Sequence, residues 1–203
     1  NKLPGEKLLV LQDTGNRAYT SLALNTFRRQ LKPRWQPQIK PLRYATYQPQ
    51  ELEALLRQPF DALYLLGGGF LPSIGNMAQQ FHRHHPQAPI VLTPWAQSSM
   101  VEANAGEAAD RILQISTYPD PVSDPTLRRY LQRFQHRFGY EPYAMSIGTR
   151  QALELLDQAF AKGYRTPLEV KRYLLSQPVH HTSLGVIRLN RYGDSEAGLQ
   201  EIG

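Results

Sequence analysis

The chain has 203 residues, of which 41% are hydrophobic and 20% are charged, and it has no cysteine. This composition is that of an ordinary globular protein, and it excludes disulfide bonds and thiolate metal sites; no apolar run approaches the ~20 residues of a bilayer span. The formal net charge of +6 raises nucleic acid or an anionic surface as a partner. The basic residues are dispersed among Asp and Glu and no recognition module accompanies them, so we expect no nucleic-acid partner.

Two denser basic groups stand on predicted helices. Arg28 and Arg29 lie close to Lys32 and Arg34, and a second group comprises Arg128, Arg129, Arg133 and Arg137. Each helix has an apolar opposite face, so the sequence predicts that both groups form solvated outer faces.

Strands and helices alternate over the first 116 residues. The expected strands, apolar runs between turn signals, are residues 7–12, 38–44, 63–66, 90–93 and 112–116. The expected helices are residues 19–31, 50–57, 72–84 and 98–105. This order predicts an α/β fold: a doubly wound, mainly parallel five-stranded sheet with helices on both faces.

A glycine run follows the third predicted strand. Gly67, Gly68 and Gly69 allow close backbone approach, Phe70 follows them, and Pro72 suits the first turn of a helix. In open α/β sheets ligands bind at the carboxyl ends of strands, so we expect this turn to form one wall of a small-molecule site. Pro72 stands where G-x-G-x-x-G needs its third glycine, which argues against a nucleotide.

The character of the sequence changes after Tyr118. A proline-rich connector leads to helices at residues 124–138, 146–162 and 167–176, with Asp124 as the expected N-cap of the first. A strand is expected at residues 184–189, and no second sheet is predicted. Three amphipathic helices need something to cover, which implies packing on the first five strands or a partner outside this chain.

Several segments, taken in order, carry a family resemblance. They are Asp13…Ala18-Tyr19, Gly68-Gly69-Phe70-Leu71-Pro72, Ala105-Gly106-Glu107-Ala108-Ala109, Phe134…Phe138-Gly139-Tyr140-Glu141-Pro142-Tyr143, Ala152-Leu153…Leu155-Leu156, and Gly185-Val186-Ile187 with Gly193-Asp194. Over about 190 residues the chain resembles the C-terminal part of extracytoplasmic solute-binding proteins of the branched-chain amino acid type, which have the type I periplasmic-binding fold.

The resemblance implies two lobes around a cleft, with part of the first lobe outside this sequence. Residues 1–118 would form the α/β ligand-binding lobe, 119–183 a helical segment belonging with the first lobe, and 184–203 a return to the α/β lobe. The chain opens without Met, so we expect a trimmed or processed chain without its signal segment. In isolation, the helices should repack on the sheet, swap or form a homodimer to hide apolar surface.

The implied function is the solute-binding component of an ABC-type uptake system, periplasmic or lipid-anchored outside the cytoplasm. It would close around a ligand and present it to a membrane permease. The alternative is a ligand-sensing domain of a signalling protein with the same fold. A flavodoxin-like enzyme is a more distant interpretation.

The expected ligand site lies at the carboxyl ends of the first, third and fourth strands. Its candidate residues are Tyr19, Phe70, Trp95, Gln97 and Ser98. In amino-acid binders of the family, a carboxylate for the ligand ammonium falls near Trp95-Ala96-Gln97, and no acid stands there. A buried unpaired ammonium is unfavourable. The sequence therefore argues against a branched-chain amino acid and favours a less charged amino-acid-like, amide or aromatic ligand.

The remaining candidate metal-binding and catalytic residues are expected to have structural roles. His82, His84 and His85 close a predicted exposed helix with no nearby carboxylate, and His180-His181 is expected in a loop, so no metal site is predicted. Asp13 suits a turn or cap. No nucleophile elbow or zinc-protease motif occurs, and we expect neither catalysis nor a cofactor.

Overall fold

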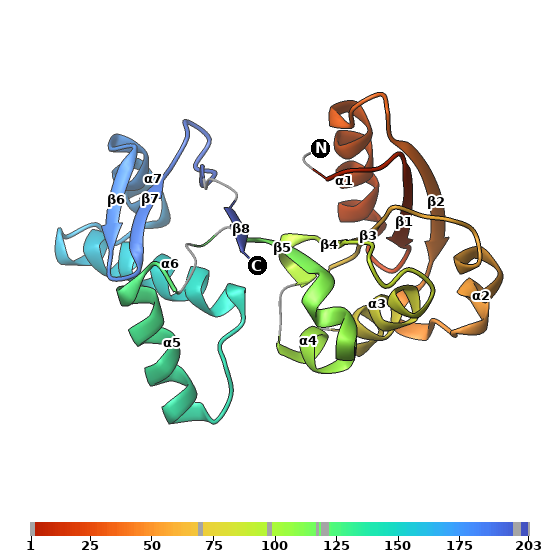
Figure 1. The fold of residues 1–203 in the computed structure, drawn as a ribbon. Helices are drawn as coiled ribbons and strands as arrows, with labels where there is room; N and C mark the ends of the chain where they lie inside the picture. The colour runs from red at the N-terminus through yellow and green to blue at the C-terminus, as the bar shows by residue number, and fades with distance from the viewer. Residues whose placement is uncertain are drawn as a thin grey trace. The chain divides into compact units, whose positions relative to one another are not determined.

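The computed structural model describes residues 3–68, 71–96, 99–116, 118, 122–196 and 200–202. The chain divides into two compact units. The sheet unit comprises residues 1–115 and 201–203, and the helical unit comprises residues 116–200. Each is drawn in Figure 1. Among the described residues, no helix has the length and apolar character needed to cross a membrane.

The sheet unit is built on a six-stranded sheet with the order β2-β1-β3-β4-β5-β8. The five predicted strands are all present and pair in parallel. The strands are β1 (Lys7–Asp13), β2 (Gln36–Leu42), β3 (Ala62–Leu66), β4 (Ile90–Leu92), β5 (Ile112–Ser116) and β8 (Gln200–Ile202). The predicted α/β fold is therefore confirmed, with β8 as an additional edge strand.

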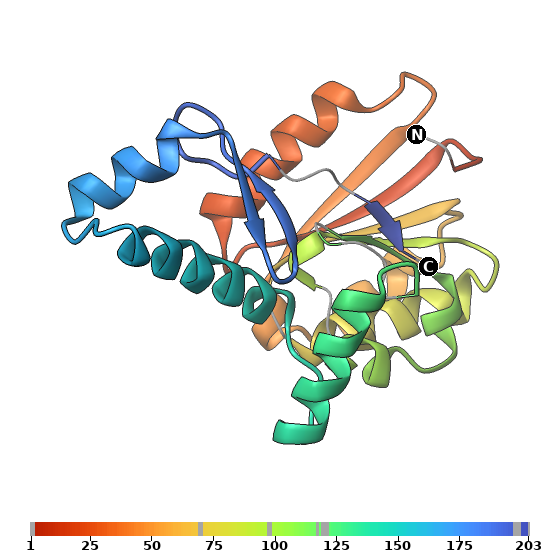
Figure 2. The ribbon, with the colours of Figure 1, turned by 90° about the vertical axis from the view of Figure 1, so that its left-hand side faces the viewer.

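Helices cover both faces of this sheet. The helices are α1 (Arg17–Gln30), α2 (Gln50–Leu56), α3 (Pro72–His84) and α4 (Ser99–Ala105). On β1, Leu8 and Val10 pack with α1, whereas Leu9 and Leu11 pack with the side that holds α2, α3 and α4. Figures 1 and 2 show α1 on the opposite side of the sheet from α3 and α4. Successive strand residues point to opposite faces, which is why both apolar sets are buried.

Strand β2 begins two residues earlier than predicted. It starts at Gln36 and includes Pro37 and Pro41, which pair with Leu8 and Gln12 of β1. Proline lacks a backbone N–H, whereas in a central strand each backbone N–H donates to one of the two neighbouring strands. The strand order places β2 at an edge, with β1 as its single neighbour, so both prolines are tolerated.

The helical unit contains α5 (Pro125–Phe138), α6 (Ala144–Ala161) and α7 (Pro167–Ser176). It also contains an antiparallel hairpin of β6 (Val179–Thr182) and β7 (Gly185–Arg188), so the expectation of no second sheet is wrong. The expected single strand at 184–189 begins at the hairpin turn. This hairpin belongs to the helical unit, and the chain rejoins the sheet unit at residue 201.

Asp124 caps α5 as predicted. Its carboxylate accepts hydrogen bonds from the backbone N–H groups of Thr126 and Leu127 at 2.8 and 3.0 Å. After the end of α6, Gly163 has φ +91°, a left-handed conformation that closes a helix without the strain a side chain would cause.

Candidate functional site

The candidate site lies at the carboxyl edge of β1, β3 and β4. Tyr19 stands in the first turn of α1 and is half-buried, and Trp95 stands on the short 3-10 turn Pro94–Ala96 that follows β4. Their rings meet edge to face with centroids 6.5 Å apart. This arrangement brings the positive edge of one ring to the negative face of the other. Trp95 remains 53% exposed, so much of its surface is free for another group.

Gly68, which follows β3, forms the floor between these two side chains. A Cβ atom at Gly68 would lie 3.8 Å from the Cβ of Trp95 and 3.9 Å from Asn16 Nδ2 and Tyr19 Cδ1. These are ordinary contact distances, so the glycine is not forced by a steric clash. The loops after three parallel strands thus converge on one small region, as expected for this edge of an α/β sheet.

Gly67 has a different role from Gly68. A Cβ atom at Gly67 would lie 2.4 Å from Cε2 of Tyr44, a contact too close to exist. Tyr44, on the 3-10 turn Tyr44–Thr46, is fully buried and donates its hydroxyl hydrogen to the Leu11 carbonyl at 2.6 Å. The first glycine of the run therefore admits the Tyr44 ring, and the second opens onto the candidate site.

Hydrogen bonds fix the strand ends that carry the site. The Asp13 carboxylate is 4% exposed and accepts from the N–H groups of Gly15 and Tyr44 at 2.9 and 3.1 Å. The Thr20 hydroxyl donates to the Asp13 carbonyl at 2.8 Å, and the Thr93 hydroxyl donates to the Gly67 carbonyl. Asp13 thus has the turn role that the sequence predicted, and it joins the ends of β1 and β2.

The aromatic and amide side chains described at the site are uncharged at neutral pH. Burial raises the pKa of the Tyr19 phenol, and a hydrogen bond with Thr93 opposes this in part. Tyr19 therefore stays protonated at neutral pH. With Asn16 and Trp95, it offers aromatic surface and neutral hydrogen-bonding groups, which suit an apolar or aromatic ligand with few polar atoms.

The structure brings together two of the five predicted site residues, Tyr19 and Trp95. Phe70, Gln97 and Ser98 lie outside the described residues. Sequence reasoning did not single out Tyr44 or Thr93. A threonine directly after a buried strand was a usable signal for Thr93, but the contact between Tyr44 and Gly67 joins distant segments and leaves no sequence pattern.

The histidines differ from expectation in two respects. His84 Nε2 lies 3.6 Å from the carboxylate of Glu53 on α2, so the expectation of no nearby carboxylate is wrong. His180 stands on β6 rather than in a loop and is 1% exposed. Its Nε2 lies 2.9 Å from the Leu174 carbonyl oxygen, and its Nδ1 lies 3.3 Å from Gln177 Nε2. Within the described ranges, no three His, Asp or Glu side chains are placed to share a metal ion.

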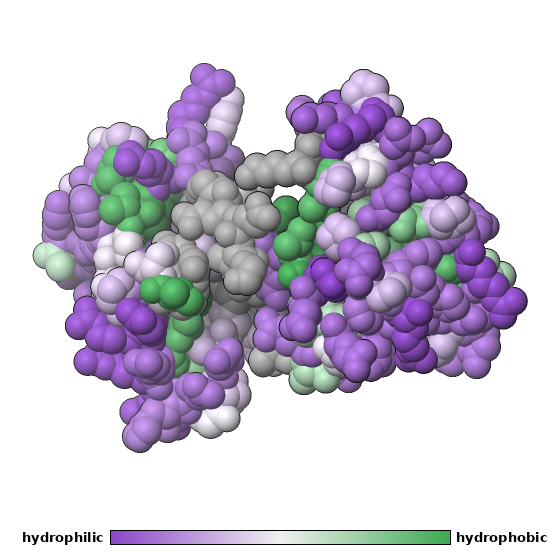
Figure 3. Space-filling model, viewed as in Figure 1, coloured by the Kyte–Doolittle hydropathy of each residue, from purple (hydrophilic) through white to green (hydrophobic). Residues whose placement is uncertain are grey.

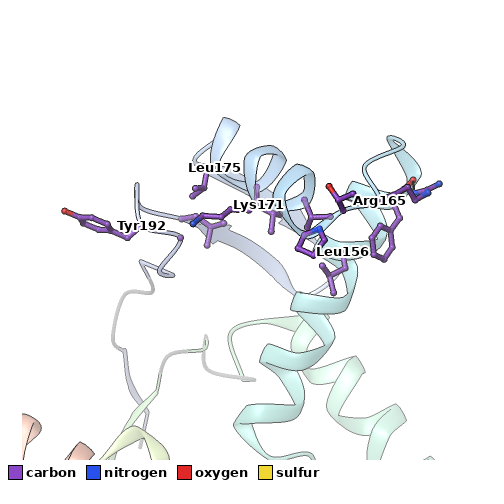
Figure 4. A pocket seen from close by; sticks show the side chains of 12 residues that line it. Leu156, Arg165, Lys171, Leu175 and Tyr192 are labelled. Carbon is purple, nitrogen blue, oxygen red and sulfur yellow. Dashed lines mark hydrogen bonds between the residues drawn. The ribbon is translucent and has the colours of Figure 1, made fainter.

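A hollow of about 540 Å³ lies within the helical unit. Figure 4 shows it beside α7, with Arg165 and Tyr192 at opposite ends and Leu156 and Leu175 between them. Its walls are mostly apolar and include Phe160 and Val170. Leu156 and Phe160 remain 36% and 42% exposed, so part of the apolar surface in this region is in contact with solvent.

Comparison with known proteins gives matches among solved structures only. Neither a protein-family model nor a curated protein sequence matches the chain. The leucine-binding protein LivK from Thermotoga maritima superimposes with a TM-score of 0.74 and 18% identity, over 96% of this chain and 56% of its own. LivJ from Streptococcus pneumoniae, a branched-chain amino acid transporter substrate-binding protein in complex with isoleucine, superimposes with a TM-score of 0.71 and 18% identity. The match covers 97% of this chain and 60% of LivJ.

A third match is a solute-binding protein of an ABC transporter from R. palustris in complex with benzoate. Its TM-score is 0.70 at 13% identity, over 97% of this chain and 54% of its own. The chain therefore has the type I periplasmic-binding fold of these substrate-binding proteins, as the sequence predicted. It spans a little over half of their length.

Proposed function

We propose that the chain is part of an extracytoplasmic solute-binding protein that serves an ABC-type permease. The observation that carries this proposal is the meeting of Tyr19 and Trp95 over Gly68 at the carboxyl edge of a sheet with this fold. Aromatic surface beside a few neutral polar groups suits the capture of a small organic molecule. Hinge closure around the ligand would then signal the loaded state to the permease.

The proposed ligand is a small aromatic or amide compound, or an amino-acid-like molecule without a free ammonium. Asn16, Tyr19 and Trp95 supply neutral polar atoms and ring surface, and no acid stands at residues 95–97 to pair with an ammonium. From their places in the sequence, we also assign Phe70, Gln97 and Ser98 to the proposed wall. The match to a benzoate complex supports an aromatic carboxylate as the first compound to test.

We further propose that the two units belong to different lobes. The sheet unit would be one wall of the cleft, and the helices of residues 119–183 would complete a lobe whose sheet lies outside this sequence. The coverage of 54–60% of the three matched structures supports this division. So does the exposed apolar surface of Leu153, Leu156 and Phe160 on α6, which a neighbouring sheet would cover.

The test is a thermal-shift screen of the full-length protein that carries these residues, against benzoate, aromatic amides, neutral amides and amino acids. A ligand that binds the folded state raises the midpoint by mass action. Trp95→Ala and Tyr19→Ala should abolish the shift, whereas Tyr192→Ala, a matched removal of an exposed ring in the helical unit, should preserve it.

Two results would contradict the proposal. One is a ligand whose affinity is unchanged by both site substitutions, since the site would then lie elsewhere. The other is micromolar or tighter binding by the 203-residue chain alone, because a half-cleft should bind weakly. Self-association of the isolated chain, measured by light scattering, would identify a second copy as the cover of the α6 surface.

A further inference from the structure

One face of α5 carries a concentrated positive charge. Arg128, Arg129, Arg133 and Arg137 are all exposed, and no Asp or Glu stands between residues 125 and 140. The opposite face holds Leu127, which is buried against Ile147 and Leu184. The four guanidinium groups therefore extend over the half of the helix that faces away from the core. In Figure 3, the region where α5 lies in Figure 1 is mostly hydrophilic.

No acidic side chain in the described part of the chain forms an ion pair with these arginines. The ion pairs found there join Arg57 and His84 to Glu53, and Arg150 to Glu154. Arg129 donates to the Pro125 carbonyl at 3.3 Å, a contact that leaves its charge uncompensated. Arginines in one row without carboxylate partners attract anions and can pair with phosphate groups in two-point contacts.

The C-terminal end of α5 adds exposed aromatic surface to this charge. The ring of Phe134 lies 4.5 Å from that of Phe138 and 5.6 Å from that of Tyr140, measured between centroids. Phe138 is 51% exposed and Tyr140 is 54% exposed. The guanidinium of Arg137 lies 5.6 Å from the centroid of Phe138, so cationic and aromatic groups are side by side.

We propose that the C-terminal end of α5 binds the surface of an anionic phospholipid bilayer. Arg133 and Arg137 would contact headgroup phosphates. Phe138, beside Arg137, and its neighbour Tyr140 would enter the boundary between headgroups and acyl chains, where aromatic side chains are favoured. A nucleic acid is the alternative occupant, and binding to DNA is one outcome of the test below. The proposal is independent of the proposed ligand.

The experiment is sedimentation of the 203-residue chain with vesicles of phosphatidylcholine alone, and with vesicles that also contain about 30 mol% of the anionic lipid phosphatidylglycerol. The chain should sediment with the anionic vesicles at low salt and much less at high salt, because the charges are screened. Each arginine near such a surface contributes about fivefold to binding, so Arg133→Gln with Arg137→Gln should lower the partition coefficient roughly 10- to 30-fold. Phe138→Ser should lower it several-fold through lost apolar contact.

The matched control is Arg28→Gln with Arg29→Gln, which removes the same charge from an exposed helix end in the sheet unit. It should change the partition coefficient less than about twofold, because the attraction is local. An equal loss in this control would show that net charge alone drives binding and would overturn the proposal. Absence of binding to anionic vesicles at low salt, equal binding to neutral vesicles, or preferential binding to DNA at the same salt would also overturn it.

Discussion

The sheet unit and the helical unit bury their apolar residues to very different extents. In the sheet unit, helices cover both faces of the parallel strands, and Leu9, Leu63 and Leu65 are fully buried. In the helical unit, the buried apolar side chains among the described residues are Leu127, Ile147, Leu155, Ala159, Val170, Tyr173 and Leu184, in two small clusters and an isolated position. A sheet closed on both faces completes its own core, whereas three helices and a hairpin leave apolar faces exposed.

The two units also differ in the interactions that stabilise them. Apolar burial dominates the sheet unit, at about 25 cal/mol for each Å² removed from water. The helical unit relies more on local hydrogen bonds: the Asp124 cap, the Thr166–Glu169 capping box and the contacts of Glu154 with the β6–β7 turn. Substitutions that delete buried volume should therefore act mainly on the first unit, and substitutions that delete acceptors on the second.

The largest expected effect is on the sheet core. Leu65→Ala removes a fully buried side chain and should lower the free energy of unfolding of the sheet unit by about 2–5 kcal/mol. Leu153→Ala on α6 makes the same chemical change at a position that is 58% exposed, and it should cost less than about 0.5 kcal/mol. Hydrogen exchange followed separately in each unit measures both values. A cost above about 2 kcal/mol for Leu153→Ala would show that another molecule or segment covers this face.

Much of the sheet unit could be predicted because its elements have a simple periodicity. The run at residues 63–66 is apolar throughout, which indicates a strand buried on both faces, and α3 begins at Pro72 and ends at His84 as predicted. Strand β2 was placed too late because Pro37 normally marks a loop, although Pro41 lay within the predicted strand. Their tolerance depends on the edge position, which follows from strand order and not from local sequence.

The hairpin and part of the site were less accessible to sequence reasoning. Strand β6 carries His180 and His181, polar residues that do not signal a strand, and His180 is buried only because α7 supplies the Leu174 carbonyl and the ring of Tyr173. Tyr19 and Trp95 were singled out because each follows a predicted strand. The contact between Tyr44 and Gly67 was not, since it depends on how two distant loops pack.

The two adjacent glycines offer a sharper test of this packing. Gly67→Ala places a Cβ 2.4 Å from the buried Tyr44 ring, so the ring must move, and the sheet unit should lose about 1–3 kcal/mol of stability. Gly68→Ala is the matched control, with its closest contact at 3.8 Å, and it should leave stability nearly unchanged. Urea unfolding followed by tryptophan fluorescence compares the two. Equal costs would contradict the assignment of the Tyr44 contact as the reason for glycine at position 67.

The next effect is smaller and depends on pH. Partial burial alone would raise the pKa of the Glu154 carboxyl, but hydrogen bonds from Ser183 and Arg150 outweigh it and hold the pKa below its usual value. A carboxyl with a lowered folded-state pKa contributes stability that is fully present above its unfolded pKa of about 4.3 and is lost as pH falls through the folded pKa. Exchange protection of the β6–β7 hairpin should therefore fall below about pH 4.5.

Glu154→Gln tests whether this carboxylate causes the acid sensitivity. The substitution removes the charge that strengthens the contacts with Ser183 and Arg150 and should cost the helical unit about 1–2 kcal/mol at neutral pH. It should also flatten the pH dependence of hairpin protection. Protection of β1 and β3 in the sheet unit is the internal control and should not change. An unchanged acid response in the variant would assign it to another group.

The smallest expected effect is on the cap of α5. Asp124→Ala leaves the N–H groups of Thr126 and Leu127 without their acceptor and should lower the stability of the helical unit by about 1 kcal/mol. Asp124→Asn keeps a carbonyl oxygen in the same place and removes only the charge, so it should recover most of the loss. Exchange of the first-turn amides of α5 distinguishes the two variants. If Asp124→Asn proved as costly as Asp124→Ala, attraction between the carboxylate charge and the helix dipole, rather than the hydrogen bonds, would be the source of stability.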